Sequence, residues 1–130
     1  MRAARFLSCL LAGACAGPAP APAPLVPDWS GPAVQARHLG DRGLEVVLVA
    51  PTAGHSFDLR SVESSADRAD LHFVHRMPGN MFQAQVVTPL PVTVDAARLG
   101  AARAVFVWIA AVEYEALPSR EKLAMALARP

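Results

Sequence analysis

The feature that most limits the fold is a change of texture at residue 44. From there on, short runs of apolar and β-branched residues alternate with turn-forming residues. Such runs predict strands, because successive side chains of a strand point to opposite faces. We expect strands over residues 44–50, 56–60, 70–76, 82–88, 90–94 and 104–112. Six strands without strand–helix–strand units predict a small all-β domain, either an antiparallel sandwich or a curled sheet.

The most apolar run, residues 104–112, contains no polar side chain. A strand that is apolar on both faces is typical of the centre of a sheet. We therefore expect Phe106 and Trp108 to be buried there. Nine residues are too few to cross a bilayer as a helix, which takes about 20.

Two further segments have less regular patterns. Pro89 and Pro91 restrict pairing, so residues 90–94 are expected to form an edge strand. Ser119 is placed to cap a short helix over residues 120–128, in which apolar residues recur at helical spacing.

The first 14 residues have the layout of a signal peptide: two arginines, a short apolar run and small side chains. Residues 11–15 (Leu-Ala-Gly-Ala-Cys) resemble a bacterial lipobox, which implies that Cys15 carries a lipid and anchors the protein in the bilayer. Ala12 stands where leucine is commonest in lipoproteins. Ordinary cleavage after Ala14 or after Ala16 stays open, and would leave a secreted or periplasmic protein.

The next segment has the composition of a spacer. Residues 16–24 contain an Ala-Pro repeat, which forms neither helix nor sheet and spans roughly 28 Å in the polyproline conformation. Residues 25–43 are expected to be irregular, with Trp29 as the one aromatic able to dock. The predicted organisation is a signal peptide (1–14), a proline-rich tether and linker (15–43), a β-domain (44–117) and a tail or short helix (118–130). In lipoproteins, an aspartate after the lipid-bearing cysteine commonly retains the protein at the inner membrane. This chain has Ala16 there, so we expect the outer membrane if the cell has two membranes.

Charge and cysteine content exclude several classes of function. The chain has 12 basic and 11 acidic residues, too balanced for the electrostatic attraction that nucleic-acid binding requires. Its two cysteines, Cys9 and Cys15, both lie in the first 15 residues. The exported part therefore has no disulfide, no thiolate nucleophile and no cysteine metal site.

Polar residues suggest no obvious reaction centre. His55, His72 and His75, joined by His38, are the only candidates for a metal site, but residues 72 and 75 face opposite sides of a strand. Ser56 is not in a nucleophile elbow, because the last position of that motif is Asp58 and not glycine. We expect a non-catalytic protein without cofactor or metal. The alternative is an enzyme or metal-binding protein whose residues converge only in the fold.

Residues 46–94 carry a resemblance. A strand, then Pro51-Thr-Ala-Gly-His-Ser, an alternating strand, a Pro78-Gly79 loop and Gln85-Val-Val-Thr together resemble the C-terminal domain of the PrcB-like protease-stability family. Members typically have Pro-Thr-Gly-Gly-Tyr-Ser, so Ala53 and His55 are departures. The resemblance implies an exported module associated with a surface protease complex, and it implies no catalytic residues.

Two loops follow from these patterns as candidate functional features. Pro51, Thr52 and Gly54 are expected to form the turn between two strands, with Gly54 at positive φ. The loop with Met77, Met81 and Phe82 presents adaptable apolar side chains around a Pro-Gly turn. This loop is the candidate contact with the partner, an envelope protein and foremost a protease or a component of its complex. The alternative is that Phe82 turns inward and the methionines only cover the core.

Overall fold

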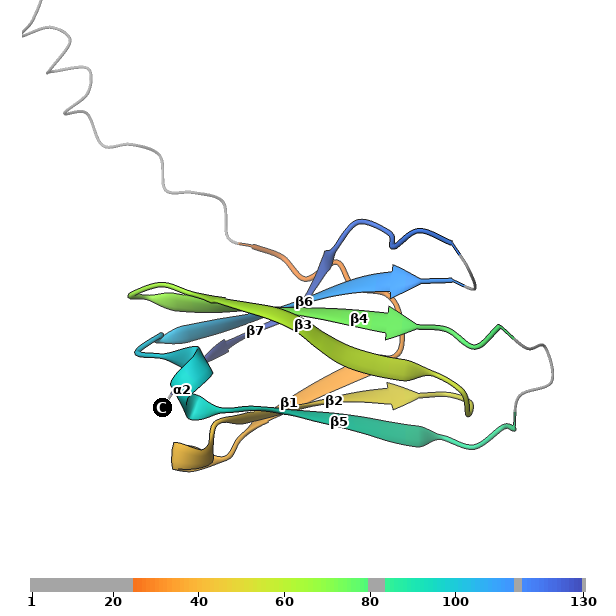
Figure 1. Cartoon of the computed structure of the whole chain (residues 1–130), viewed down its shortest axis with the longest axis horizontal. Coiled ribbons are helices and arrows are strands. Elements are labelled where there is room, and N and C mark those ends of the chain that lie inside the picture. The colour runs from red at the N-terminus through yellow and green to blue at the C-terminus, as the bar shows by residue number, and fades with distance from the viewer. Residues whose placement is uncertain (1–24, 80–83, 114–115, 130) are drawn as a thin grey trace, which may run out of the picture.

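Two sheets packed face to face make up the computed structural model, which describes residues 25–79, 84–113 and 116–129 (Figure 1). One sheet has the order β1-β2-β5, with strands β1 (Ala33–His38), β2 (Leu44–Ala50) and β5 (Thr88–Val94). The other has the order β3-β4-β6-β7, with strands β3 (Ser56–Ser64), β4 (Arg68–Arg76), β6 (Ala104–Val112) and β7 (Lys122–Ala128). A 3-10 turn (Gly40–Arg42) and a short helix, α2 (Ala96–Leu99), complete the described elements. The expected small all-β sandwich is confirmed.

The core lies between the sheets and follows the alternation of the strands. Every second residue of β2, beginning with Leu44, is fully buried, and the residues between them are only partly so. The opposite layer contributes Leu71 and Phe73 from β4, as expected, and the stacked ring of Phe57 from β3. Burial of these side chains supplies the main stabilising free energy of a domain that has no disulfide.

Strands β4 and β6 run parallel, whereas all other pairs are antiparallel. The chain leaves β4, returns along β5 in the other sheet and passes through α2 before it enters β6 (Figure 1). Three passes along the sandwich bring β6 beside β4 in the same direction. The sheet is therefore mixed, which the expected antiparallel arrangement did not include.

Both ends of the sandwich differ from expectation. The segment predicted to be irregular contains β1, and the predicted helix over residues 120–128 is strand β7. In β7, Leu123, Met125 and Leu127 also alternate at the period of a strand, and the edge of β6 offers unpaired backbone groups to which a further strand can bind. The sandwich therefore extends beyond residues 44–117 on both sides.

The expected strand over residues 82–88 is also wrong in its described part. Residues 84–87 have no regular structure, and residues 82–83 lie outside the described chain. Pairing with β2 begins only at Thr88 and includes Pro89 and Pro91. Because β5 has β2 as its one neighbour, the expected edge strand is confirmed.

Phe106 and Trp108 are not in the core, contrary to expectation. In β6 the fully buried side chains are Val105, Val107 and Ile109, while Phe106 and Trp108 alternate with them and are half-buried. The second sheet covers only one face of this strand. The two aromatic rings therefore lie on the outer face of the four-stranded sheet.

Glycines set two of the turns. Gly54 has φ +88°, which confirms the expected positive φ between β2 and β3. Gly43 has φ +116°, and a β-carbon there would collide with the carbonyl oxygen of Val94. Only glycine fits this close approach between the start of β2 and the end of β5.

Candidate binding surface

The turn between β2 and β3 and the described residues 77–79 that follow β4 lie at the same end of the sandwich (Figure 1). The Ala53 N–H, in the turn with Pro51, Thr52 and Gly54, donates to the Ala84 carbonyl at 3.1 Å. The Met77 N–H donates to the Val112 carbonyl at 3.0 Å. Met81 and Phe82 lie outside the described residues.

The turn also brings two histidines together. The His55 Nδ1 lies 2.8 Å from the His75 Nε2, and the Thr52 Oγ1 lies 3.0 Å from the His55 Nε2. The imidazole planes differ by 3° and their centres are 5.0 Å apart. Since the centres are further apart than the bonded nitrogens by about two ring radii, the rings meet edge to edge in one plane. The sequence placed His55 and His75 among candidates but did not predict this contact.

The direction of these hydrogen bonds follows from burial. His75 is 0% exposed and its Nδ1 has no partner among the described residues. A lone pair is cheaper to leave unpaired there than an N–H, so we place the proton on His75 Nε2, which donates to His55 Nδ1. The His55 Nε2–H then donates to Thr52. In this arrangement His55 has no lone pair directed at the hydroxyl, so Thr52 is not activated as a nucleophile.

Both histidines are held in the neutral form. Burial lowers the pKa of His55, and burial together with the neighbouring His55 lowers the pKa of His75 to about 4. Trp29 packs edge-on against His75 with ring centres 6.0 Å apart, so the expected docking of this tryptophan is confirmed. The hydrogen-bonded side chains of Thr52, His55 and His75 at this end of the sandwich are therefore uncharged.

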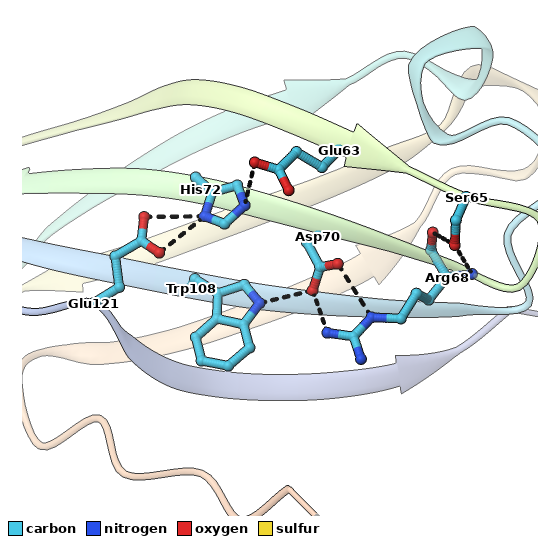
Figure 2. Close-up of polar contacts among 7 residues, drawn as sticks. All are labelled: Glu63, Ser65, Arg68, Asp70, His72, Trp108 and Glu121. Atoms are coloured by element: carbon cyan, nitrogen blue, oxygen red, sulfur yellow. Dashed lines mark hydrogen bonds and ion pairs between the residues drawn. The ribbon is translucent and has the colours of Figure 1, made fainter.

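A second polar cluster lies on the outer face of the four-stranded sheet (Figure 2). The Asp70 carboxylate accepts hydrogen bonds from Arg68 Nη2 at 2.6 Å, from Arg68 Nε at 3.1 Å and from the Trp108 indole N–H at 2.8 Å. Burial alone would raise the pKa of Asp70, but the hydrogen bonds from Arg68 and Trp108 lower it below its usual value. One carboxylate therefore fixes both a guanidinium and an indole ring.

The same guanidinium covers the neighbouring aromatic ring. Arg68 lies 4.1 Å from the ring centre of Phe106, which is a cation–π contact. Asp70 and Phe106 are register partners in the parallel β4–β6 pair. Arginine, aromatic ring and carboxylate therefore form a single fixed unit.

His72 lies next along β4, between two carboxylates (Figure 2). Its Nδ1–H donates to both Glu121 oxygens at 3.0 Å, while the nearest Glu63 oxygen, 3.6 Å from Nε2, is too far for a hydrogen bond. As predicted, His72 and His75 face opposite sides of the strand. Glu63 comes from β3 and Glu121 from the residue before β7, so this grouping depends on the order of strands in the sheet.

Between these side chains the surface is hollowed. An open hollow of about 470 Å³ is lined by Arg68, Asp70, His72, Trp108, Arg120 and Glu121. We call this region, with Phe106 and Glu63 at its margin, the Trp108 face. The sequence analysis did not predict this surface: it considered His72 only as a metal ligand and Trp108 only as a core residue. The spacing of residues 68, 70 and 72 was a signal that they share one side of a strand.

The fold and this face define a small β-sandwich with an ordered aromatic and charged surface on one sheet. No family model, no curated protein and no solved structure matches the chain. Over the described residues, no helix is long and apolar enough to cross a membrane. The same residues include no group of three or more His, Cys, Asp or Glu side chains arranged to hold a metal ion.

Proposed function

We propose that this protein is a non-catalytic, envelope-anchored module that binds another envelope protein through the Trp108 face. The observation that carries the proposal is that the Asp70 carboxylate accepts hydrogen bonds from both Arg68 and Trp108 and so fixes both side chains. Tryptophan and arginine are the residues most enriched among those that dominate binding energy. Side chains that are already fixed lose less conformational entropy when a partner binds.

The place of action follows from the N-terminal segment. The expected signal peptide, a lipid on Cys15 and the Ala-Pro tether would put the sandwich at the envelope, a short distance from the bilayer. The described chain begins just after the tether, and the Asp28 and Trp29 N–H groups both donate to the Leu123 carbonyl. The resemblance around Pro51 makes a surface protease complex the first partner to test.

The loop that carries Met77, Met81 and Phe82 is proposed as a second contact. Met77 lines a hollow of about 330 Å³ together with Trp29, Ser119 and Lys122 at the loop end of the sandwich. This hollow and that of the Trp108 face share no lining residue, although Ser119 and Lys122 of the one flank Arg120 and Glu121 of the other in the sequence. Variants therefore separate the two surfaces.

The alternative is an enzyme or a metal-binding protein whose residues meet only in the fold. The pair His55 and His75 is the convergence that favours it. Their bonded nitrogens point at each other at 2.8 Å, so no ion fits between them without separating the rings. This arrangement favours the binding module.

The test is capture of partners from solubilised membranes by the full-length acylated protein, read by mass spectrometry. We expect one envelope protein to be enriched, and Trp108→Ala to weaken its capture by about tenfold, equivalent to about 1.4 kcal/mol. Leu117→Ala is the matched control, because Leu117 is 91% exposed and is not part of the face.

Circular dichroism must first show that each variant is folded. If Trp108→Ala captures the partner as well as the wild type does, and Met77→Ser/Met81→Ser does not capture it, the contact lies in the loop and not on the Trp108 face. The absence of any specific partner for the wild type would refute the binding module itself.

A further inference from the structure

We infer that the partner inserts a basic side chain, foremost an arginine, onto Trp108 beside Glu121. This inference rests on the proposed function of the Trp108 face and names the chemistry of its occupant. The chain already contains such an arrangement at Phe106, two residues before Trp108 on β6.

The chain provides its own template at Phe106. There a guanidinium lies 4.1 Å from the centre of an aromatic ring and is held from the side by a carboxylate, Asp70. Phe106 and Trp108 are two residues apart on β6 and therefore point to the same face of the sheet. Each is the register partner of a polar residue on β4, Asp70 for Phe106 and His72 for Trp108.

Trp108 also has carboxylates beside it, but neither Arg68 nor Arg120, which line the same hollow, makes a cation–π contact with its ring. Its indole N–H is bound by Asp70, which holds the ring in place, and Glu121 lines the same hollow (Figure 2). Among the described residues, the one cation–π contact is that of Arg68 with Phe106. Tryptophan is the aromatic residue that binds cations best, so this ring is suited to receive one from a partner.

The charges around the hollow favour a cation over an anion. Its two guanidiniums are already engaged, Arg68 by Asp70 at 2.6 Å and Arg120 by Asp28 at 3.5 Å. The carboxylates of Glu63 and Glu121 are 75% and 41% exposed and flank the ring of His72. An anionic group would meet these carboxylates, whereas a guanidinium stacks on the indole and pairs with Glu121.

The test uses two small probes of nearly equal size and shape, one with a charged guanidinium and one with an uncharged urea group. The full-length protein in detergent is titrated with N-acetyl-arginine methylamide and, in parallel, with the uncharged citrulline analogue. The Trp108 indole N–H resonance is followed by NMR, assigned from its loss in Trp108→Phe, with the Trp29 indole as internal reference. We expect a saturable shift of Trp108 with the arginine probe and binding of the citrulline probe at least about tenfold weaker.

Variants of the face separate this inference from the proposed function. We expect Glu121→Gln to weaken the arginine probe by about threefold or more, and Leu117→Ala to leave it unchanged. Equal binding of both probes, or no shift of Trp108, overturns the inference. Partner capture that requires Trp108 but ignores Glu121→Gln leaves the binding module standing and refutes the basic occupant, whereas loss of all specific capture refutes both.

Discussion

Among the described titratable side chains, His75 is the one that is fully buried. Its Nε2 bonds His55 and its Nδ1 has no described partner. Protonation would place a second N–H in this buried site and a charge beside the His55 ring. Because the pKa of His75 is lower in the folded state than in the unfolded chain, the stability of the fold depends on pH.

We expect the free energy of unfolding to fall as the pH is lowered from 7 to 4. His75 has a pKa of about 4 when folded and 6.5 as its ordinary value, so the unfolded chain binds more protons throughout this interval. The stabilising contribution is present above pH 6.5 and lost on descent to pH 4, about 3 kcal/mol in total. The lowered pKa of His55 acts in the same direction.

Urea unfolding at pH 7, 5.5 and 4 measures this dependence. The free energy of unfolding of His75→Gln should depend less on pH than that of the wild type, whatever its value at pH 7. His38→Gln is the matched control, because His38 lies at the far end of β1 and its Nε2 is 3.0 Å from the Ala128 carbonyl oxygen. Equal slopes for the wild type and His75→Gln would show that His75 does not titrate as described.

At the scale of one element, β6 shows how alternation divides roles. Its inward side chains fill the core against the second sheet, and its outward aromatic rings build the Trp108 face. The strand is apolar on both faces, but the second sheet buries only one of them, and the other is the face that we propose to bind a partner. Composition alone does not distinguish them.

Substitutions in β6 should therefore differ in cost according to the face. Ile109→Ala opens a cavity in the core and should lower the free energy of unfolding by about 3 kcal/mol. Trp108→Ala removes a half-buried ring and one hydrogen bond to Asp70, and should cost about 1–2 kcal/mol. Denaturant titration of both variants decides the matter, since equal costs would place the indole in the core.

At the scale of the whole molecule, the described chain is fastened where it leaves the tether. The Leu123 N–H donates to the Asp28 carboxylate at 2.7 Å, and the Leu123 carbonyl accepts from Asp28 and Trp29. These bonds tie the first described residues to strand β7. If Cys15 carries a lipid, residues 28–29 would connect the anchored N-terminal segment to strand β7 of the sandwich.

Lipidation at Cys15 is expected to be lost in Cys15→Ser and kept in Cys9→Ser. The two cysteines lie close together in the sequence, and only Cys15 stands at the end of the lipobox-like segment. Incorporation of labelled palmitate, followed by separation of membrane and soluble fractions, measures the outcome. Equal labelling of the wild type and Cys15→Ser would exclude the anchor.

The all-β class, most of the strands and the edge position of β5 could be predicted from the order of residues. Alternation and proline are local properties, because the backbone alone sets the period of a strand and the loss of an N–H. Strands such as β2 and β6 were therefore predictable at their bounds. The turn glycine Gly54 was predictable for the same reason.

Which strands are neighbours, and which face of each strand is covered, depends on contacts made in the folded chain. The segment that forms β7 fits a helix or a strand by its own pattern, and the free edge of β6 selects the strand. The parallel register of β4 and β6 brings Asp70 to Phe106 and His72 to Trp108, and the β2–β3 turn brings His55 to His75. These contacts join residues distant in the chain, so no local period encodes them, and the candidate site depends on all of them.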